Sequence, residues 1–171
     1  MVNMNREEET GKHKIWKYFL VISAVIVIDQ ISKFFVERII QDGSVYLIGN
    51  FVHLTLVKNT GAAFGILKNQ NFLLAVVSAV FSLIALFYII MSKDKKYKLC
   101  LALISAGAVG NFIDRIRLGY VIDFFNAGFW PAFNIADSAI SLGIFFLVLM
   151  AMFESRKKDT GKMDGKKKGE S

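Results

Sequence analysis

Four long apolar segments constrain the fold of this chain more than any other feature. They lie at about residues 16–36, 71–92, 98–116 and 133–153. A helix needs about 20 predominantly apolar residues to cross the hydrocarbon core of a bilayer, and each segment has this length or comes close to it. With 54% hydrophobic residues and 16 Phe, the composition exceeds what one soluble core needs. The sequence therefore predicts a mainly α-helical membrane protein with four transmembrane helices.

Positive charge is concentrated in three blocks between and beyond these segments. Residues 1–17, the connection 92–98 and the tail from Arg156 onward hold four, four and seven of the 21 Lys and Arg residues. Placing both chain ends in the cytoplasm puts all three blocks inside, as the positive-inside rule requires, and argues against nucleic-acid binding. We therefore expect a cytoplasmic arm at 1–15, a four-helix domain at 16–153 and a disordered basic cytoplasmic tail at 154–171.

This topology leaves two connections on the outer side of the membrane. The longer one, about 37–70, contains "FVHLTLV", which is rich in β-branched and aromatic residues and precedes an Asn-Thr-Gly turn signal. We expect it to form a small β subdomain of short strands on the outer membrane surface. The shorter connection, 117–132, contains Asp123.

Most ionisable residues within the apolar segments lie toward the same predicted side. Asp29 and Lys33 are spaced i, i+4 near the outer end of the first helix, so they share a face and can pair. Asp114 and Arg115 are neighbours at the outer end of the third helix, and we expect them to form a second structural ion pair. Asn111 lies on that helix, and Asn134 and Asp137 begin a polar stripe near the outer end of the fourth.

Asp123 and Asp137 differ from the other acids because the sequence places no cation within a helical turn of either. Two such carboxylates at an apolar boundary are costly to ionise together, which raises the pKa of at least one. A pair of this kind supports acid/base activation of water: one carboxylate accepts a proton from water while its protonated partner polarises a scissile carbonyl. We therefore interpret Asp123 and Asp137 as a candidate catalytic pair.

Other chemistries and functions remain as alternatives with less support. A Ser-His-Asp triad requires His53 to reach Ser138 or Ser141, and Cys100 is interpreted as a small buried hydrophobe. The sequence has no cluster of His and Cys for a metal, so we expect no metal or cofactor. A proton-coupled transporter explains intramembrane acids but not their clustering at one depth. A non-enzymatic scaffold requires no unpaired acids.

Ordered motifs across residues 16–153 resemble those of lipoprotein signal peptidase, the bacterial signal peptidase II. They are "IDQISK" at 28–33, "VKNTGAAFG" at 57–65, "GAVGNFIDRIRLGYVIDFF" at 107–125 and "FNIADSAIS" at 133–141. The resemblance implies an aspartyl intramembrane endopeptidase of the bacterial inner membrane. It implies cleavage of the signal peptide from a prolipoprotein just before a cysteine that carries diacylglycerol.

The resemblance also implies roles for individual residues. It assigns catalysis to Asp123 and Asp137. It assigns support of the substrate, the site geometry or the fold to eight others: Asn59, Gly61, Asn111, Asn134, Arg115, Asp114, Asp29 and Lys33. The expected partners are diacylglyceryl-modified prolipoproteins, membrane lipid and globomycin-like inhibitors, and we expect the chain to act as a monomer.

Overall fold

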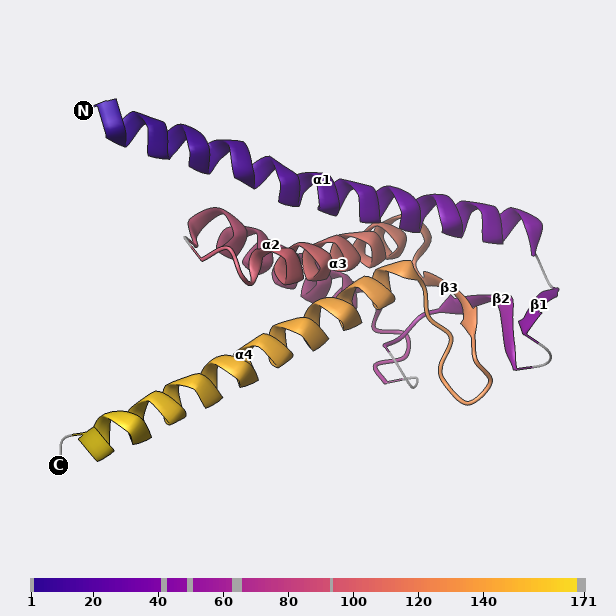
Figure 1. The fold of residues 1–171 in the computed structure, drawn as a ribbon. Coiled ribbons are helices and arrows are strands. Elements are labelled where there is room, and N and C mark those ends of the chain that lie inside the picture. The colour runs from indigo at the N-terminus through magenta and orange to yellow at the C-terminus, as the bar shows by residue number, and fades with distance from the viewer. Residues whose placement is uncertain (1, 41–42, 49–50, 63–65, 93, 169–171) are drawn as a thin grey trace.

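The computed structural model describes residues 2–40, 43–48, 51–62, 66–92 and 94–168, with the side chains of 2–14 and 157–168 outside the description. In chain order the elements are α1 (Val2–Ile39), β1 (Ser44–Ile48), β2 (Val52–Asn59), α2 (Asn71–Met91), α3 (Lys98–Leu118), β3 (Val121–Asn126) and α4 (Ile135–Lys168). Both termini and the α2–α3 connection lie at one end of the helices, and the sheet lies at the other (Figure 1).

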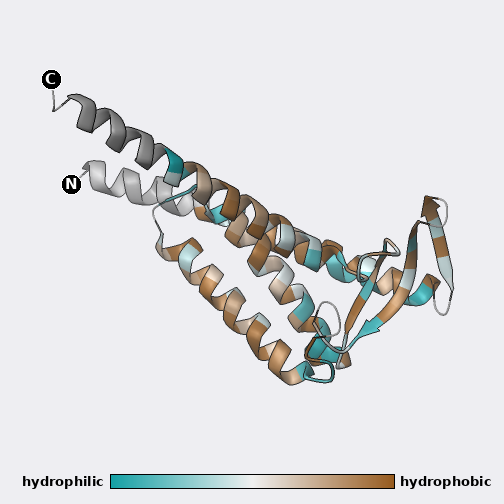
Figure 2. Ribbon diagram, turned by 90° about the horizontal axis from the view of Figure 1, so that it is seen from below, coloured by the Kyte–Doolittle hydropathy of each residue, from teal (hydrophilic) through white to brown (hydrophobic). Residues whose placement is uncertain are grey.

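The structure confirms four helices of membrane-spanning length and hydropathy. They are Ile15–Ile39, Asn71–Met91, Lys98–Leu118 and Ile135–Arg156. In α3 half of the apolar window is buried inside the protein, against 17–28% in the other three, so α3 is the central helix. Large apolar side chains of α1, α2 and α4 are exposed, and Figure 2 shows much of these helices in the brown of hydrophobic residues.

Small residues allow α3 and α4 to approach closely. A Cβ on Gly107 would overlap the carbonyl oxygen of Ala136 and lie 2.7 Å from Ile140 Cγ1. Further along the same interface, a Cβ on Gly143 would lie 2.7 Å from the carbonyl oxygen of Cys100. The backbones therefore touch at two levels, and this contact positions the first turn of α4 against the half of α3 that is nearer the sheet.

The sheet is antiparallel, with strand order β1-β2-β3. Strands β1 and β2 confirm the β structure expected within residues 37–70. Strand β3 was not predicted, because "VIDFFN" is short and was taken as part of a connection. In the sheet Val57 pairs with Asp123 and Asn59 with Val121, so the segment between α1 and α2 and the α3–α4 connection form one sheet.

Both ends of the chain extend the helices beside them. The arm predicted at 1–15 is the N-terminal part of α1, which begins at Val2. The tail at 154–171 was expected to be disordered, but α4 continues as a helix to Lys168. Extending an existing helix avoids the cost of nucleation, and the only Pro lies before α4, so no residue of the tail forces an earlier end.

Candidate active site

Asp123 lies in β3 and is held by two asparagine side chains. Asp123 is buried, with 1% of its surface exposed. Asn59 Nδ2 donates a hydrogen bond to Asp123 Oδ2 at 2.8 Å, and Asn134 Nδ2 donates to Oδ1 at 2.8 Å. Asn59 reaches Asp123 because β2 and β3 pair, and its own Oδ1 accepts the backbone N–H of Gly61 at 2.9 Å. The β2–β3 pairing therefore sets the position of this carboxylate.

Asp137 lies in the first turn of α4 and closes a reciprocal cap with Asn134. Asn134 Oδ1 accepts the backbone N–H of Asp137 at 2.8 Å, and Asp137 Oδ2 accepts the backbone N–H of Asn134 at 3.3 Å. This is the geometry of a capping box, and the positive end of the helix dipole favours a negative charge there. Asn111 Nδ2 donates to Asp137 Oδ1 at 2.7 Å. The local sequence that starts α4 thus also orients its carboxylate.

Asn111 and Asn134 connect the two acids. Asn134 Nδ2 lies 2.8 Å from Asp123 Oδ1 and 3.1 Å from Asn111 Oδ1, while Asn111 uses its own amide nitrogen for Asp137. A chain of amides therefore runs from one carboxylate to the other. Within the described residues, neither carboxylate has a cation at ion-pair distance, in line with the contrast drawn from the sequence.

A buried ion network lies behind this chain of amides. Lys33 Nζ is 2.8 Å from Asp29 Oδ2, 2.8 Å from Asp114 Oδ2 and 3.2 Å from Asn111 Oδ1. The Asp29–Lys33 pair was predicted. The prediction of an Asp114–Arg115 ion pair was wrong. Consecutive helical residues point in different directions, and Asp114 pairs with Lys33 instead.

The carboxylates of this network also hold the backbone beside the two candidate acids. Asp29 Oδ1 accepts the N–H of Ala136 at 2.9 Å, next to Asp137. Asp114 Oδ2 accepts the N–H of Ile122 at 3.3 Å, next to Asp123. The network therefore contacts the chain one residue from each candidate acid. Gln30, which the sequence analysis missed, donates to Asp114 Oδ1 at 2.9 Å.

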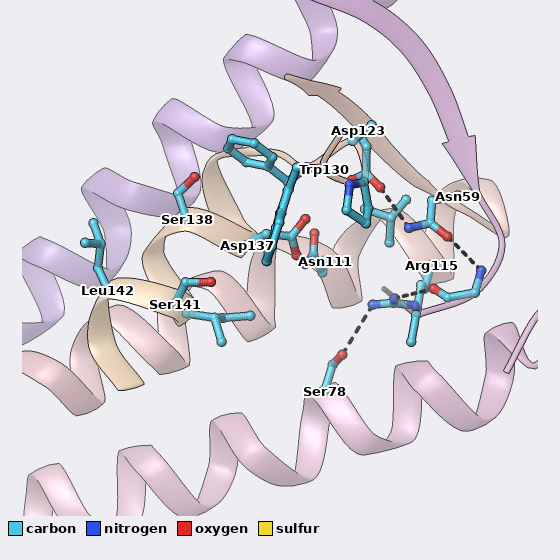
Figure 3. Close-up of a pocket in the computed structure, with 17 residues that line it drawn as sticks. Asn59, Ser78, Asn111, Arg115, Asp123, Trp130, Asp137, Ser138, Ser141 and Leu142 are labelled. Atoms are coloured by element: carbon cyan, nitrogen blue, oxygen red, sulfur yellow. Dashed lines mark hydrogen bonds between the residues drawn. The ribbon is translucent and has the colours of Figure 1, made fainter. Parts of the chain in front are cut away.

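Arg115 points away from Asp114 and toward the other candidate residues. Its guanidinium nitrogens lie 3.4 Å from the carbonyl oxygen of Gly61 and 3.4 Å from Ser78 Oγ (Figure 3). Ser78 lies on α2 and was not singled out from the sequence, since a lone Ser in an apolar helix carries no local signal. Arg115 therefore joins α2 and α3 to the turn that follows β2.

A cavity of about 700 Å³ opens beside the two acids. Figure 3 shows Asp123, Asp137, Asn111 and Arg115 at its wall. The apolar part of its lining includes Trp130, Pro131, Phe133, Ile140 and Leu142. Ser138 and Ser141 continue the polar stripe of α4 along the cavity. An elongated ligand with both apolar and polar parts matches this lining.

The environment of Asp123 moves the pKa of its carboxyl to the neutral range. Burial, and then the negative charge of Asp137, raise the pKa of Asp123 to about 7, against the opposing hydrogen bonds from Asn59 and Asn134. A carboxylic acid with such a pKa can donate a hydrogen bond or a proton at neutral pH. Together with a capped and hydrogen-bonded Asp137, the site has the parts of an acid/base pair.

The residues of the alternative chemistries, His53 for a triad and Cys100 for a thiol, do not line this cavity. His53 lies opposite Asn126 in the sheet and packs against Tyr46, and it is not part of the cavity wall. Cys100 is buried near the start of α3, away from the sheet end. Across the described ranges, no three His, Cys, Asp or Glu side chains form a group suited to a metal ion.

Comparison with known proteins agrees with the geometry. Residues 21–153 match the family described as signal peptidase (SPase) II. A lipoprotein signal peptidase of Moorella thermoacetica is 42% identical over 133 residues, covering 76% of this chain and 89% of the relative. One from Caldanaerobacter subterraneus subsp. tengcongensis is 38% identical over 138 residues, covering 79% and 95%.

Two solved structures of bacterial membrane enzymes share the fold. The first has a TM-score of 0.79 and 27% identity, and the alignment covers 85% of this chain and 93% of that one. The second has a TM-score of 0.72 and 28% identity, with coverage of 81% and 94%. The fold similarity thus extends over nearly the full length of each neighbour.

Proposed function

The chain belongs to the signal peptidase II family of aspartic peptidases, and from this premise we propose that Asp123 and Asp137 are its catalytic pair. The protein is a multi-pass bacterial membrane protease that removes signal peptides from prolipoproteins. The observation that carries the proposal is the placement of these two acids. They share one cavity wall, are bridged by Asn111 and Asn134, and have no cation partner among the described residues.

The two acids have different roles in this proposal. Asp137 is the general base, because the α4 N-terminus and two N–H donors stabilise its ionised carboxylate. Asp123 is the general acid, because its pKa of about 7 leaves the protonated form available at neutral pH. Asp137 accepts a proton from water as the water oxygen attacks the scissile carbonyl, and Asp123 donates a hydrogen bond to the carbonyl oxygen. The proton on Asp137 then passes to the leaving amine, and no step needs a cofactor.

The other residues of these motifs act around this pair. Asn59 and Asn134 orient Asp123, and Asn111 orients Asp137. Lys33, with Asp29 and Asp114, anchors the backbone beside both acids. Arg115 offers guanidinium N–H donors at the cavity wall for oxygen atoms of the substrate, and the Gly61 carbonyl, which accepts from this guanidinium, holds it in place.

The substrate in this proposal is a prolipoprotein whose cysteine carries diacylglycerol. The signal helix enters the cavity from the bilayer, and cleavage occurs just before the lipidated cysteine. The apolar lining around Trp130 and Phe133 suits the lipid, while the polar stripe of Ser138 and Ser141 suits the peptide. A globomycin-like inhibitor would compete for the same cavity.

The orientation in the membrane follows from charge. Both termini and the α2–α3 connection lie at the end opposite the sheet (Figures 1 and 2), and these segments carry 15 of the 21 Lys and Arg residues. The positive-inside rule then places the arm, the connection and the basic tail in the cytoplasm, and the site near the outer leaflet. A monomer suffices, because one chain supplies every residue of the proposed mechanism.

The test uses purified full-length protein with diacylglyceryl-modified and unmodified prolipoprotein. Asp123→Asn and Asp137→Asn should each lower the cleavage rate by about 10²- to 10⁴-fold, the usual contribution of a positioned acid or base. Asp94→Asn is the matched control, because Asp94 is an exposed acid at the opposite end. Thermal melting verifies that each variant is folded. Full cleavage by either variant of the pair, or a transport activity without cleavage, would refute the proposal.

A further inference from the structure

A second cavity lies at the opposite end of the helices from the two acids. It has a volume of about 450 Å³ and lies between α2, α3 and α4. We call it the termini-side groove; its lining is Tyr88, Ser92, Asp94, Tyr97, Lys98, Leu101, Leu147 and Ala151. Figure 2 shows the α2–α3 connection at the same end as both termini. The proposed peptidase chemistry makes no use of this groove.

Lys98 is the unusual residue of the groove. It is 6% exposed, yet none of the described residues lies within hydrogen-bond or ion-pair distance of its ammonium group. Lys98 Nζ is not among the fully buried unpartnered atoms of the described residues, so the side-chain stem is buried while the ammonium group reaches the surface of the groove without a counter-ion. Such a side chain is therefore suited to bind an anion supplied from outside the chain.

The start of α3 adds further donors at the same place. Tyr97 is the N-cap residue and makes no side-chain cap, and the first turn holds no acidic residue. The first helical backbone hydrogen bond runs from the N–H of Leu101 to the carbonyl of Tyr97 at 2.9 Å. The amides of the three residues before Leu101 precede that bond and have no partner within the helix. These amides and the helix dipole favour an anion.

The acids nearby do not cancel this preference. Glu154 accepts a hydrogen bond from Tyr97 Oη at 2.5 Å and pairs with Lys96 Nζ at 2.6 Å. The Asp94 carboxylate accepts the backbone N–H of Lys96 at 2.9 Å. Across this connection three described lysines, Lys95, Lys96 and Lys98, face two acids, which leaves an excess of positive charge.

The floor of the groove is apolar and opens to the lipid-facing surface. Leu101 and Leu147 are half-buried, and Ala151 is exposed on a helix face within the membrane-spanning part of α4. We propose that the groove binds an anionic phospholipid, with the phosphate between Lys98 and the first amides of α3. One acyl chain lies along Leu101, Leu147 and Ala151. A free phosphate ion would use the donors but would leave this apolar floor uncovered.

The experiment measures lipid retention by native mass spectrometry of the full chain in detergent. The probes are phosphatidylglycerol and phosphatidylcholine with identical acyl chains, and inorganic phosphate is the competitor. Lys98→Gln removes the charge that lines the groove, and Lys95→Gln is the matched control, because it removes the same charge from an exposed residue of the same connection. Ala151→Trp fills the floor and leaves every charge in place.

We expect wild-type protein to retain phosphatidylglycerol about tenfold more strongly than phosphatidylcholine. Lys98→Gln should weaken phosphatidylglycerol binding by roughly tenfold or more, as for loss of a charge-assisted hydrogen bond. Lys95→Gln should weaken it by less than about fivefold, the effect of one Lys near a membrane surface. Ala151→Trp should weaken both lipids.

Several results would overturn the proposal. One is an equal loss of phosphatidylglycerol binding in the two lysine variants, and another is equal retention of the two lipids by the wild type. The others are unchanged lipid binding by Ala151→Trp, and displacement of bound phosphatidylglycerol by an equimolar amount of inorganic phosphate. Thermal melting of each variant separates lost binding from lost folding. If Lys98→Gln does not fold, the response of Ala151→Trp and the lipid preference of the wild type still decide the outcome.

Discussion

Lys33 provides the sharpest test of the structure, because one ammonium group serves two buried carboxylates. Lys33 is 2% exposed, and its Nζ lies 2.8 Å from both Asp29 Oδ2 and Asp114 Oδ2. Substitution of Lys33 by Met keeps most of the side-chain volume but leaves both acids buried without a cation. Removing one partner of a buried ion pair costs about 3–5 kcal/mol. We therefore expect Lys33→Met to lose a large fraction of the free energy of unfolding, which is about 5–15 kcal/mol for native proteins in general.

The expected change in melting temperature follows from the size of the protein. For chains of this length, 1 kcal/mol corresponds to about 2–4 °C, so Lys33→Met should melt about 6–20 °C lower. The assay is a thermal melt in detergent with a thiol-reactive fluorophore. Cys100 is the only cysteine and is 3% exposed, so it reacts when the helices separate. Lys17→Met is the matched control, because Lys17 is an exposed lysine on the same helix.

A triple variant isolates the electrostatic part of the effect. Lys33→Met combined with Asp29→Asn and Asp114→Asn removes all three charges and keeps an oxygen acceptor near the backbone N–H groups that the acids now bind. It should recover much of the lost melting temperature. A melting temperature for Lys33→Met within 2 °C of the Lys17→Met value, a margin of about 1 kcal/mol or less, would refute the reasoning.

Three further predictions concern Asp123 and the glycines. With a pKa of about 7, Asp123 as general acid predicts a cleavage rate that falls about tenfold per pH unit above about pH 7; a flat rate to about pH 9 would contradict that role. Because burial raises this pKa above its ordinary value of 3.8, its contribution to folded stability is fully present below about pH 4. That contribution is lost as pH rises to about 7, and unfolding titrations of Asp123→Asn should lack this part of the pH dependence. Gly107→Ala should lower the melting temperature more than Gly119→Ala, because the new Cβ at position 107 overlaps the Ala136 carbonyl oxygen. At Gly119 the new Cβ meets open space, and Gly119→Ala costs only about 1–2 kcal/mol of stability, which a positive φ demands of a non-glycine residue. Equal melting temperatures of the two variants would contradict this ranking.

Several features of the site were predictable from the sequence because they depend on local spacing. The four helices follow from the lengths of the apolar segments. The Asp29–Lys33 pair follows from an i, i+4 spacing. Asp123 and Asp137 differ from the other acids because no cation lies near either of them along the chain. Each of these inferences needs only residues within one helix or one connection.

The features that the sequence did not show arise from contacts between distant segments. Asp114 is adjacent to Arg115 in the chain but pairs with Lys33, 81 positions away, because α1 packs against that face of α3. Strand β3 forms because β2 offers it a partner edge. The positions of Asn59 and Asn111 beside the acids likewise depend on the packing of different elements.

The sequence alone therefore indicated four membrane-spanning helices, the family resemblance and the identity of the two candidate acids, since hydropathy, charge and spacing are written along the chain. Only the tertiary structure decided which groups surround those acids. Hydrogen bonds and ion pairs require atoms to lie within about 3–4 Å of each other. Such distances between Lys33, Asn111 and Asn134 are set by close packing of α1, α3 and α4, where glycines let the α3 and α4 backbones touch.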